Sequence, residues 1–191
     1  MLEKITYFEK KGPENTEAAL KLAVEAAREL GIGKLVIATT AGNTPKLLAD
    51  QIDHEGLDIT VIAYAYGQRG EPGSNPMPQE LRKYLQGKGF HVHSAGHALS
   101  GAERSLSTTF GGAYPVEIIA HTLRMFSQGV KVCVEVCAMA ADGGYVVGGE
   151  PVVAVAGTGG GADTVLVLRP EVSSKILKTR IDRIIAKPIL E

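Results

Sequence analysis

The sequence has no tryptophan, only two cysteines and few aromatic residues, which make up 5% of its 191 residues. Two cysteines are too few for a disulfide-stabilised scaffold, and the apolar surroundings of Cys133 and Cys137 favour core packing over redox chemistry. Charged residues make up 21%, and the formal net charge of −1 argues against a general nucleic-acid binder. No apolar run is long enough to cross a membrane, and residues 1–4 lack the apolar core of a signal peptide. We therefore expect a cytoplasmic protein that contacts neither nucleic acid nor membrane.

Glycine and aliphatic residues are what the sequence has in abundance. It contains 23 glycines, and 45% of its residues are hydrophobic. A chain of this length and apolar content can bury one sizeable core. We find no internal repeat, low-complexity tract or linker, so we expect one domain over residues 1–191. Many of the glycines follow apolar runs, where a ligand could approach the main chain closely.

Apolar runs alternate with amphipathic stretches along the chain, which predicts a doubly wound α/β sheet. The expected strands are residues 5–8, 35–38, 58–64, 90–94, 152–156 and 165–168. The expected helices are residues 16–30, 44–52, 78–87, 115–126 and 130–141. Too few residues precede the last strand for a helical crossover, so it should run antiparallel to its predecessor. We expect residues 96–114 to form loop or short helical turns, and residues 173–191 a short helix or mixed segment on an edge.

The turn formed by residues 39–44 is the first candidate for a functional site. It follows the buried strand at 35–38 and contains Gly42, and Thr44-Pro45 has the residue types of a helix N-cap and first helical position. Free main-chain N–H groups and the positive end of the helix dipole would then point out of the sheet edge. This arrangement predicts an anion site, most naturally for a phosphate. The alternative is an ordinary capped turn without a ligand.

A second glycine-rich loop spans residues 157–164 and follows the strand at 152–156. Gly157, Gly159 and Ala162 formally match the dinucleotide pattern G-x-G-x-x-A. The context does not fit, because that fingerprint requires a helix after the loop and here a strand follows. Such a loop can still surround a phosphate with its main-chain amides. We expect both loops to face one crevice.

Other polar residues lie in loops that could border that crevice. Residues 66–77 form a Gly/Pro-rich loop after a strand, suited to a lid or equally to a plain surface excursion. Arg104 could pair with a phosphate or with Glu103. Glu135 lies in an apolar run, where a carboxylate needs a partner or a function, and a structural hydrogen bond is the default expectation.

Three histidines follow the pattern H-x-H-x-x-x-H at positions 91, 93 and 97. Two of them share one face of a strand, so a metal site is conceivable, but no cysteine or carboxylate cluster lies nearby. We therefore assign no metal, and we expect His97, in the loop after the strand, to touch a ligand. The sequence shows no Ser-His-Asp order, no P-loop lysine and no catalytic carboxylate pair.

Several of these segments resemble the C-terminal domain of pyruvate kinase. The strand and turn at 35–44 resemble the element that holds a phosphate of the allosteric sugar bisphosphate there, and residues 152–168 resemble the strands and loop that close over it. Segments 98–105, 110–112 and 161–164 are more similar to free-standing archaeal and bacterial proteins called pyruvate kinase α/β-domain-like. The resemblance implies a three-layer α/β/α fold with a mostly parallel sheet and a last antiparallel strand.

The same resemblance implies a ligand. Members of the free-standing group can carry flavin mononucleotide (FMN), and nothing in this sequence is similar to the catalytic barrel of pyruvate kinase, so kinase activity is not implied. We expect a phosphate-bearing ligand, with FMN the best single candidate. A sugar-phosphate sensor acting on a partner or on its own homo-oligomer is the alternative, and a flavin-dependent redox enzyme is a third hypothesis. The residues expected to contact the ligand are Thr39, Thr40, Gly42, Asn43, Thr44, Tyr66, Gly67, His97, Glu103, Arg104, Ser105, Gly157, Thr158, Gly159, Gly160, Gly161, Asp163 and Thr164.

Overall fold

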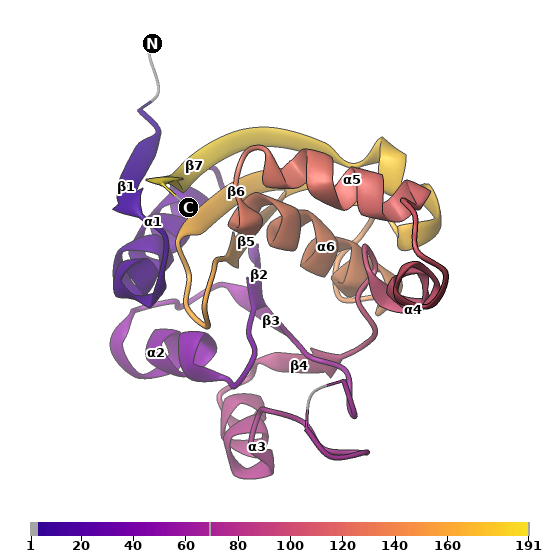
Figure 1. The fold of residues 1–191 in the computed structure, drawn as a ribbon. Coiled ribbons are helices and arrows are strands. Elements are labelled where there is room, and N and C mark those ends of the chain that lie inside the picture. Colours follow the sequence, from indigo (N-terminus) through magenta and orange to yellow (C-terminus); the bar gives the residue numbers. More distant parts are fainter. Residues whose placement is uncertain (1–3, 69, 191) are drawn as a thin grey trace.

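One seven-stranded mixed sheet organises the computed structural model, which describes residues 4–68 and 70–190 (Figure 1). The strands are β1 (Thr6–Lys10), β2 (Lys34–Ala38), β3 (Asp58–Ala63), β4 (His91–Ser94), β5 (Val152–Ala156), β6 (Thr164–Arg169) and β7 (Arg180–Leu190). The α-helices are α1 (Thr16–Glu29), α2 (Asn43–Gln51), α3 (Gln79–Gly87), α4 (Gly101–Phe110), α5 (Pro115–Arg124) and α6 (Gln128–Asp142). Two short 3-10 helices, η1 (Pro13–Asn15) and η2 (Ser173–Lys178), complete the described elements.

The strand order is β1-β7-β6-β5-β2-β3-β4. Strands β5, β2, β3 and β4 are parallel, as expected for strands joined by helical crossovers. Strand β6 pairs antiparallel with β5, which confirms the direction predicted from the short connection. Strand β7 pairs antiparallel with β6 and parallel with β1, so β6 alone runs against the other six.

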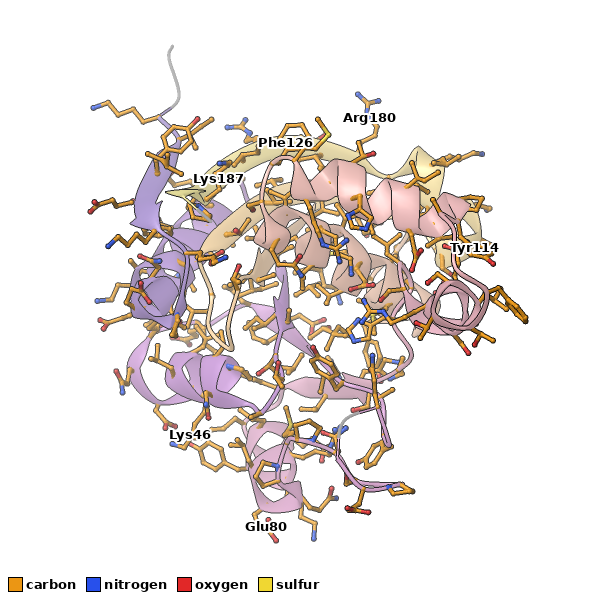
Figure 2. All side chains as sticks on the ribbon, viewed as in Figure 1. Lys46, Glu80, Tyr114, Phe126, Arg180 and Lys187 are labelled. Atoms are coloured by element: carbon orange, nitrogen blue, oxygen red, sulfur yellow. The ribbon has the colours of Figure 1, made fainter. Side chains whose placement is uncertain are left out.

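Helices cover both faces of the sheet, which gives the three-layer α/β/α fold that the resemblance implied (Figure 1). Alternate residues of β2 point to opposite faces: Leu35 and Ile37 pack in the cluster of α1, α2 and α3. Val36 packs in the opposite cluster, against α6. Charged side chains on the outer helices, such as Lys46 and Glu80, point away from the sheet (Figure 2).

The central helix of the second face is α6, and most of its residues are buried. This confirms the buried helix expected at 130–141. Helix α4 differs from the prediction of loop or short turns, because it runs for ten residues. None of its residues is buried, and its serines and threonines are weak helix formers, so no apolar stripe marked it in the sequence.

The segment after residue 173 begins with the short helix η2, in agreement with the sequence prediction, but continues as a long strand inside the sheet and not on its edge. Strand β7 is eleven residues long and lies between β6 and β1. Its pairing with β6 shifts register twice, between Val165 and Leu166 and between Val167 and Leu168. Such irregularities break the alternation of apolar and polar residues by which a strand is normally recognised.

No helix in the described ranges is long and apolar enough to cross a membrane.

Candidate functional site

A cavity of about 810 Å³ opens at the sheet edge where β2, β3 and β5 end. The turn after β2 and the glycine loop after β5 form one side of it, and α6 with the start of the α4 segment forms the other. The chain continues from β2 to β3 on one side, whereas β5 lies on the other side of β2. The cavity therefore lies at a topological switch point, the usual ligand position in open α/β sheets. The two loops singled out in the sequence thus border a single cavity.

The turn after β2 is shaped by Gly42, whose φ of 93° lies in the left-handed region. Gly42 is the N-cap of α2, so the prediction that Thr44 caps this helix is wrong, and Thr44 lies in the first turn instead. The hydroxyl oxygen of Thr39 accepts a hydrogen bond from the Gly42 N–H at 2.9 Å and closes the turn. Among the residues that the structure describes, four N–H groups of this turn find no acceptor, those of Thr40, Ala41, Asn43 and Thr44.

Two polar side chains, Thr16 and Asp163, accept hydrogen bonds from the main chain of the glycine loop after β5. Thr16, in the first turn of α1, accepts a hydrogen bond from the Ala162 N–H at 3.0 Å. The buried carboxylate of Asp163 accepts from the N–H of Thr158 at 3.2 Å and from the N–H of Gly12 at 3.1 Å. Burial raises the pKa of Asp163. These contacts fix the loop from the side away from the cavity.

The upper part of the same loop leaves its main chain free. Gly159 and Gly160 have φ of 71° and 95°, a conformation that favours glycine. The N–H groups of residues 159–161 donate no hydrogen bond to the described part of the chain. Successive unpaired amides of this kind form a concave anion site.

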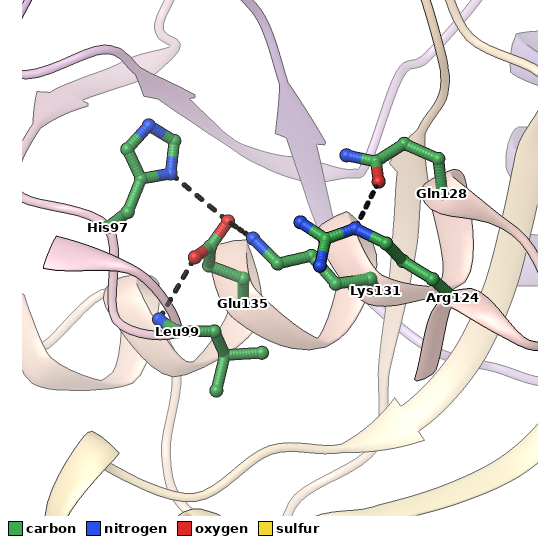
Figure 3. Close-up of polar contacts among 6 residues, drawn as sticks. All are labelled: His97, Leu99, Arg124, Gln128, Lys131 and Glu135. Atoms are coloured by element: carbon green, nitrogen blue, oxygen red, sulfur yellow. Dashed lines mark hydrogen bonds and ion pairs between the residues drawn. The ribbon is translucent and has the colours of Figure 1, made fainter. Parts of the chain in front are cut away.

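The opposite wall carries a buried polar cluster centred on Glu135 of α6 (Figure 3). One carboxylate oxygen, Oε1, accepts the N–H of Leu99 at 2.9 Å. The other, Oε2, accepts from Nδ1 of His97 at 3.1 Å and from Nζ of Lys131 at 2.5 Å. Burial alone raises the pKa of Glu135, but the hydrogen bond from His97 and the charge of Lys131 outweigh it and lower this pKa to about 2. Glu135 is therefore an anion at neutral pH.

Positive charge predominates around this cluster. Lys131 is buried, which lowers its pKa, and its charge is also disfavoured by Arg124 and Arg104 nearby. The guanidinium of Arg124 is oriented by a 2.7 Å hydrogen bond from Nε to Oε1 of Gln128 (Figure 3). All three cations line the cavity, and Glu135 is the single carboxylate among the described lining residues. Chemically, the cavity can bind an anion between main-chain N–H groups on one side and cations on the other.

The family model described as "Pyruvate kinase, alpha/beta domain" matches residues 17–168, which is most of the sequence. The chain belongs to this family. A solved pyruvate kinase from Cryptosporidium parvum is similar at 16% identity with a TM-score of 0.42. The similarity covers 81% of this chain and 22% of that one, so the chain spans about a fifth of the length of that pyruvate kinase.

In this pyruvate kinase α/β domain, most residues predicted for the site border the cavity. They are Thr39, Thr40, Asn43, Thr44, His97, Arg104, Gly157, Thr158, Gly159, Gly160 and Gly161. The sequence located them through the two strand–loop connections, because parallel strands end at the same edge of a sheet.

Seven predicted residues lie outside the cavity lining. Gly42 packs against Leu81 of α3, where a Cβ atom would not fit. Asp163 and Thr164 are buried beneath the glycine loop. The remaining four, at positions 66, 67, 103 and 105, serve local structure or the surface. The ring of Tyr66 lies under the Arg82 guanidinium, and the Gly67 N–H donates a hydrogen bond to Ser74 O. Glu103 accepts a hydrogen bond from the N–H of Glu117 at the start of α5. Ser105 is exposed on α4.

The three histidines do not converge in the domain. His91 pairs with Asp58 at 3.2 Å, His93 contacts the ring of Tyr145, and only His97 lines the cavity. Over residues 4–68 and 70–190, no group of three His, Cys, Asp or Glu side chains could hold a metal ion. Cys133 and Cys137 are buried and unpaired, and burial raises the pKa of both thiols.

Sequence reasoning missed much of the charged wall. Lys131, Arg124, Gln128 and Tyr64 were not predicted as site residues. The available signal was the i, i+4 pair of Lys131 and Glu135 inside an apolar helix, because two opposite charges on one buried face imply an ion pair. No local signal existed for Arg124, which is placed by the packing of α5 on α6.

Proposed function

We propose that this domain binds a small phosphate-bearing ligand in the cavity at the carboxyl edge of its sheet. The observation that carries the proposal is that unpaired N–H groups from two separate loops surround one cavity. They are those of Thr40, Ala41, Asn43 and Thr44 and those of residues 159–161, together called the amide cradle. The first set includes the start of α2, whose dipole favours an anion. Arg104, Arg124 and Lys131 supply compensating charge from the opposite wall.

FMN is the specific ligand that we propose first. The cavity volume of about 810 Å³ falls within the range of about 300–1,000 Å³ that is usual for small-molecule sites. The two loops would hold the phosphate through their amides and through the hydroxyls of Thr40, Thr44 and Thr158. The rings of Tyr64 and His97, whose centroids are 4.9 Å apart, would border the flavin ring. A bound flavin would supply electron-transfer chemistry, which the redox-enzyme hypothesis requires.

Sugar-phosphate sensing is the second candidate, and the polar character of the far wall favours it. Gln128 and Arg124 present amide and guanidinium groups that suit sugar hydroxyls better than a flavin ring. A sensor would change its association with a partner, or with further copies of itself, when the ligand binds. Sedimentation with and without fructose 1,6-bisphosphate measures that change directly.

The first experiment is purification without added ligand, followed by visible absorption and mass spectrometry of any released molecule. Calorimetric titrations with FMN, fructose 1,6-bisphosphate and inorganic phosphate then measure affinity. We expect Thr44→Ala combined with Gly159→Val to weaken binding at least about tenfold, because the valine opposes the left-handed φ of 71° and closes the amide cradle. Unchanged affinity would contradict this placement of the phosphate.

A matched control separates the loss of the cradle from general backbone strain. Gly149 has φ of 82° and open space around its Cβ position, as Gly159 does, but it precedes β5 at the other end of that strand. Gly149→Val should therefore destabilise the domain to a similar extent without changing ligand affinity. A protein that binds sugar phosphates but not FMN would favour the sensor, and a protein that binds none of the probes would refute the proposal.

A further inference from the structure

The hydrogen bonds of Glu135 determine which nitrogen of His97 carries a proton. An ionised carboxylate can only accept hydrogen bonds, and Oε2 lies 3.1 Å from Nδ1 of His97. The proton of the neutral imidazole must therefore be on Nδ1. The second ring nitrogen, Nε2, then carries a lone pair, which is the form of histidine that accepts a proton from a substrate.

Nε2 lies on the side of the ring that faces away from Glu135 (Figure 3). His97 lines the cavity, and its side chain is 19% exposed while Glu135 is 1% exposed. No described residue forms a hydrogen bond with Nε2. The ring of Tyr64 packs edge-on against the imidazole, with centroids 4.9 Å apart, and limits its rotation. The structure thus holds an oriented, unpaired base at the cavity wall.

Stability alone does not account for this arrangement. Lys131 and Glu135 are both almost completely buried in a helix whose other inward residues are valine, cysteine, alanine and methionine. Apolar replacements of a buried ion pair are often neutral or stabilising, because desolvation of two charges offsets their attraction. Such a cluster beside a cavity, with a strongly shifted carboxylate, has the features of a functional group.

We propose that His97 is the catalytic base of a proton-transfer reaction on a phosphorylated hydroxy-carbonyl compound, with Glu135 as its positioning residue. Nε2 takes a proton from the carbon next to the carbonyl group. The electron pair of that C–H bond forms a C=C bond, and the carbonyl electrons move onto oxygen to give an enediolate. Return of the proton from Nε2 to the carbon it left completes exchange. Return to the neighbouring carbon, with transfer of the hydroxyl proton between the two enediolate oxygens, completes isomerisation, so no oxidant, reductant or co-reactant is consumed.

The surrounding charges suit both halves of this step. The Glu135 carboxylate stabilises the imidazolium that forms, through the Nδ1 hydrogen bond. Lys131 has donors beyond the one used by Glu135, and Arg124 lies nearby, so the enediolate oxygen can be stabilised by cations. This inference rests on the phosphate site proposed above, because the amide cradle must hold the substrate phosphate, but it does not require the ligand to be FMN.

The test follows exchange of the α-proton by proton NMR in D2O, with dihydroxyacetone phosphate, fructose 6-phosphate and ribose 5-phosphate as probes. Each probe is first titrated calorimetrically, so binding and exchange are measured separately. We expect at least one bound probe to lose its α-proton faster with the protein than without it. His97→Asn should lower that rate by about 10²–10⁴-fold, the usual contribution of a general base, with affinity changed little. The asparagine amide can still donate to Glu135, so the variant removes Nε2 while preserving the cluster.

Two further variants separate catalysis from structure. His121→Asn removes an exposed imidazole on α5, outside the cavity lining, and should leave exchange unchanged. Glu135→Gln should lower kcat with little effect on KM, and nitrogen NMR of His97 should show the Nδ1–H form partly lost. If Glu135→Gln fails to fold, the His97→Asn comparison and the nitrogen NMR of the wild-type protein still decide the question.

The outcomes distinguish this inference from the proposed function. Probes that bind without exchanging their α-protons, or exchange that persists in His97→Asn, would overturn the catalytic role and leave the phosphate site standing. Binding of FMN with no binding of any sugar phosphate would do the same. If inorganic phosphate, FMN and the sugar phosphates all fail to bind, the phosphate site and the catalytic role both fall.

Discussion

Thr16 links the start of α1 to the glycine loop after β5, because its hydroxyl oxygen accepts a hydrogen bond from the Ala162 N–H at 3.0 Å across 146 residues of sequence. The same hydroxyl donates to Pro13 O at 2.6 Å, so the first turn of α1 and the glycine loop form one unit. The position of the glycine loop, which supplies part of the proposed phosphate site, therefore depends on the position of the first turn of α1. The shape of the loop should respond to changes in residues 12–16, which do not line the cavity.

Gly161→Ala should disturb this unit. An added Cβ would overlap Pro13 and would lie 2.6 Å from the Thr16 hydroxyl, and neither can move without shifting the start of α1. We expect a loss of about 1–3 kcal/mol in the free energy of unfolding and weaker ligand binding. Chemical denaturation and calorimetry measure the two effects. Gly33→Ala is the control, because its Cβ meets nothing within 4 Å and its φ is not positive; equal effects of both substitutions would contradict the close contact.

The packing of α6 against β6 should be equally sensitive to a substitution of Gly129. A Cβ there would overlap the Thr164 hydroxyl and would lie 2.5 Å from the Thr164 Cβ, so Gly129→Ala must push α6 away from β6. We expect destabilisation of about 2–3 kcal/mol and weaker binding of phosphate probes, since α6 carries Lys131 and Glu135. Gly101→Ala, at the start of α4 with open space around it, should leave thermal stability almost unchanged. A wild-type melting temperature for Gly129→Ala would mean that the two elements are further apart.

Acid should destabilise the domain through Glu135. Its pKa is about 2 in the folded protein against 4.5 when unperturbed, so the unfolded state binds the proton more readily. The stabilisation is fully present above about pH 4.5 and is lost as pH falls from there through about 2; its size is about 3 kcal/mol. Denaturation at a series of pH values measures this loss.

The matched variant for the acid experiment is Glu135→Gln, which removes the titrating group. It should be less stable than the wild type at pH 7, and the difference between the two should shrink as the pH falls toward 2. A difference that stays constant across this range would show that Glu135 does not titrate as its contacts with His97, Lys131 and Leu99 imply.

Removal of one cation should weaken anion binding in a salt-dependent way. Arg124→Met deletes a guanidinium that Gln128 orients toward the cavity wall. We expect the affinity for phosphate-bearing probes to fall about five- to thirtyfold at low salt, with a smaller change at high salt. Lys83→Met changes the net charge by the same amount on the exposed side of α3 and is the control. Equal losses in both variants would indicate a general charge effect.

The parts that sequence reasoning predicted well are those encoded by local patterns. The alternation of aliphatic runs and amphipathic stretches gave the layers, and the two strand–loop connections at Thr39–Thr44 and Gly157–Gly161 identified one wall of the cavity. A shift of the N-cap from Thr44 to Gly42 escaped prediction, because both residue types can precede a helix and the Thr39 hydroxyl decides between them.

What escaped prediction depends on contacts between distant segments. Arg124 reads as a surface cation at the end of a helix, and only the packing of α5 on α6 brings it to the cavity. Lys131 and Glu135 are visible as a pair, but their partner His97 is 38 positions from Glu135. Strand β7 was obscured because two register shifts against β6 remove the regular alternation of its isoleucines.

The position of β7 has a consequence for how the chain folds as it is synthesised. Strand β1 is made first, yet the neighbour with which it pairs is β7, where Thr6 aligns with Ala186. Residues 6–10 therefore cannot pair with β7 until residues 180–190 have been translated. Pairings of such long range close slowly, because the loop entropy must be overcome before any contact forms. The growing chain should thus expose an unpaired strand β1 until β7 emerges, which is the interval in which chaperones protect such edges.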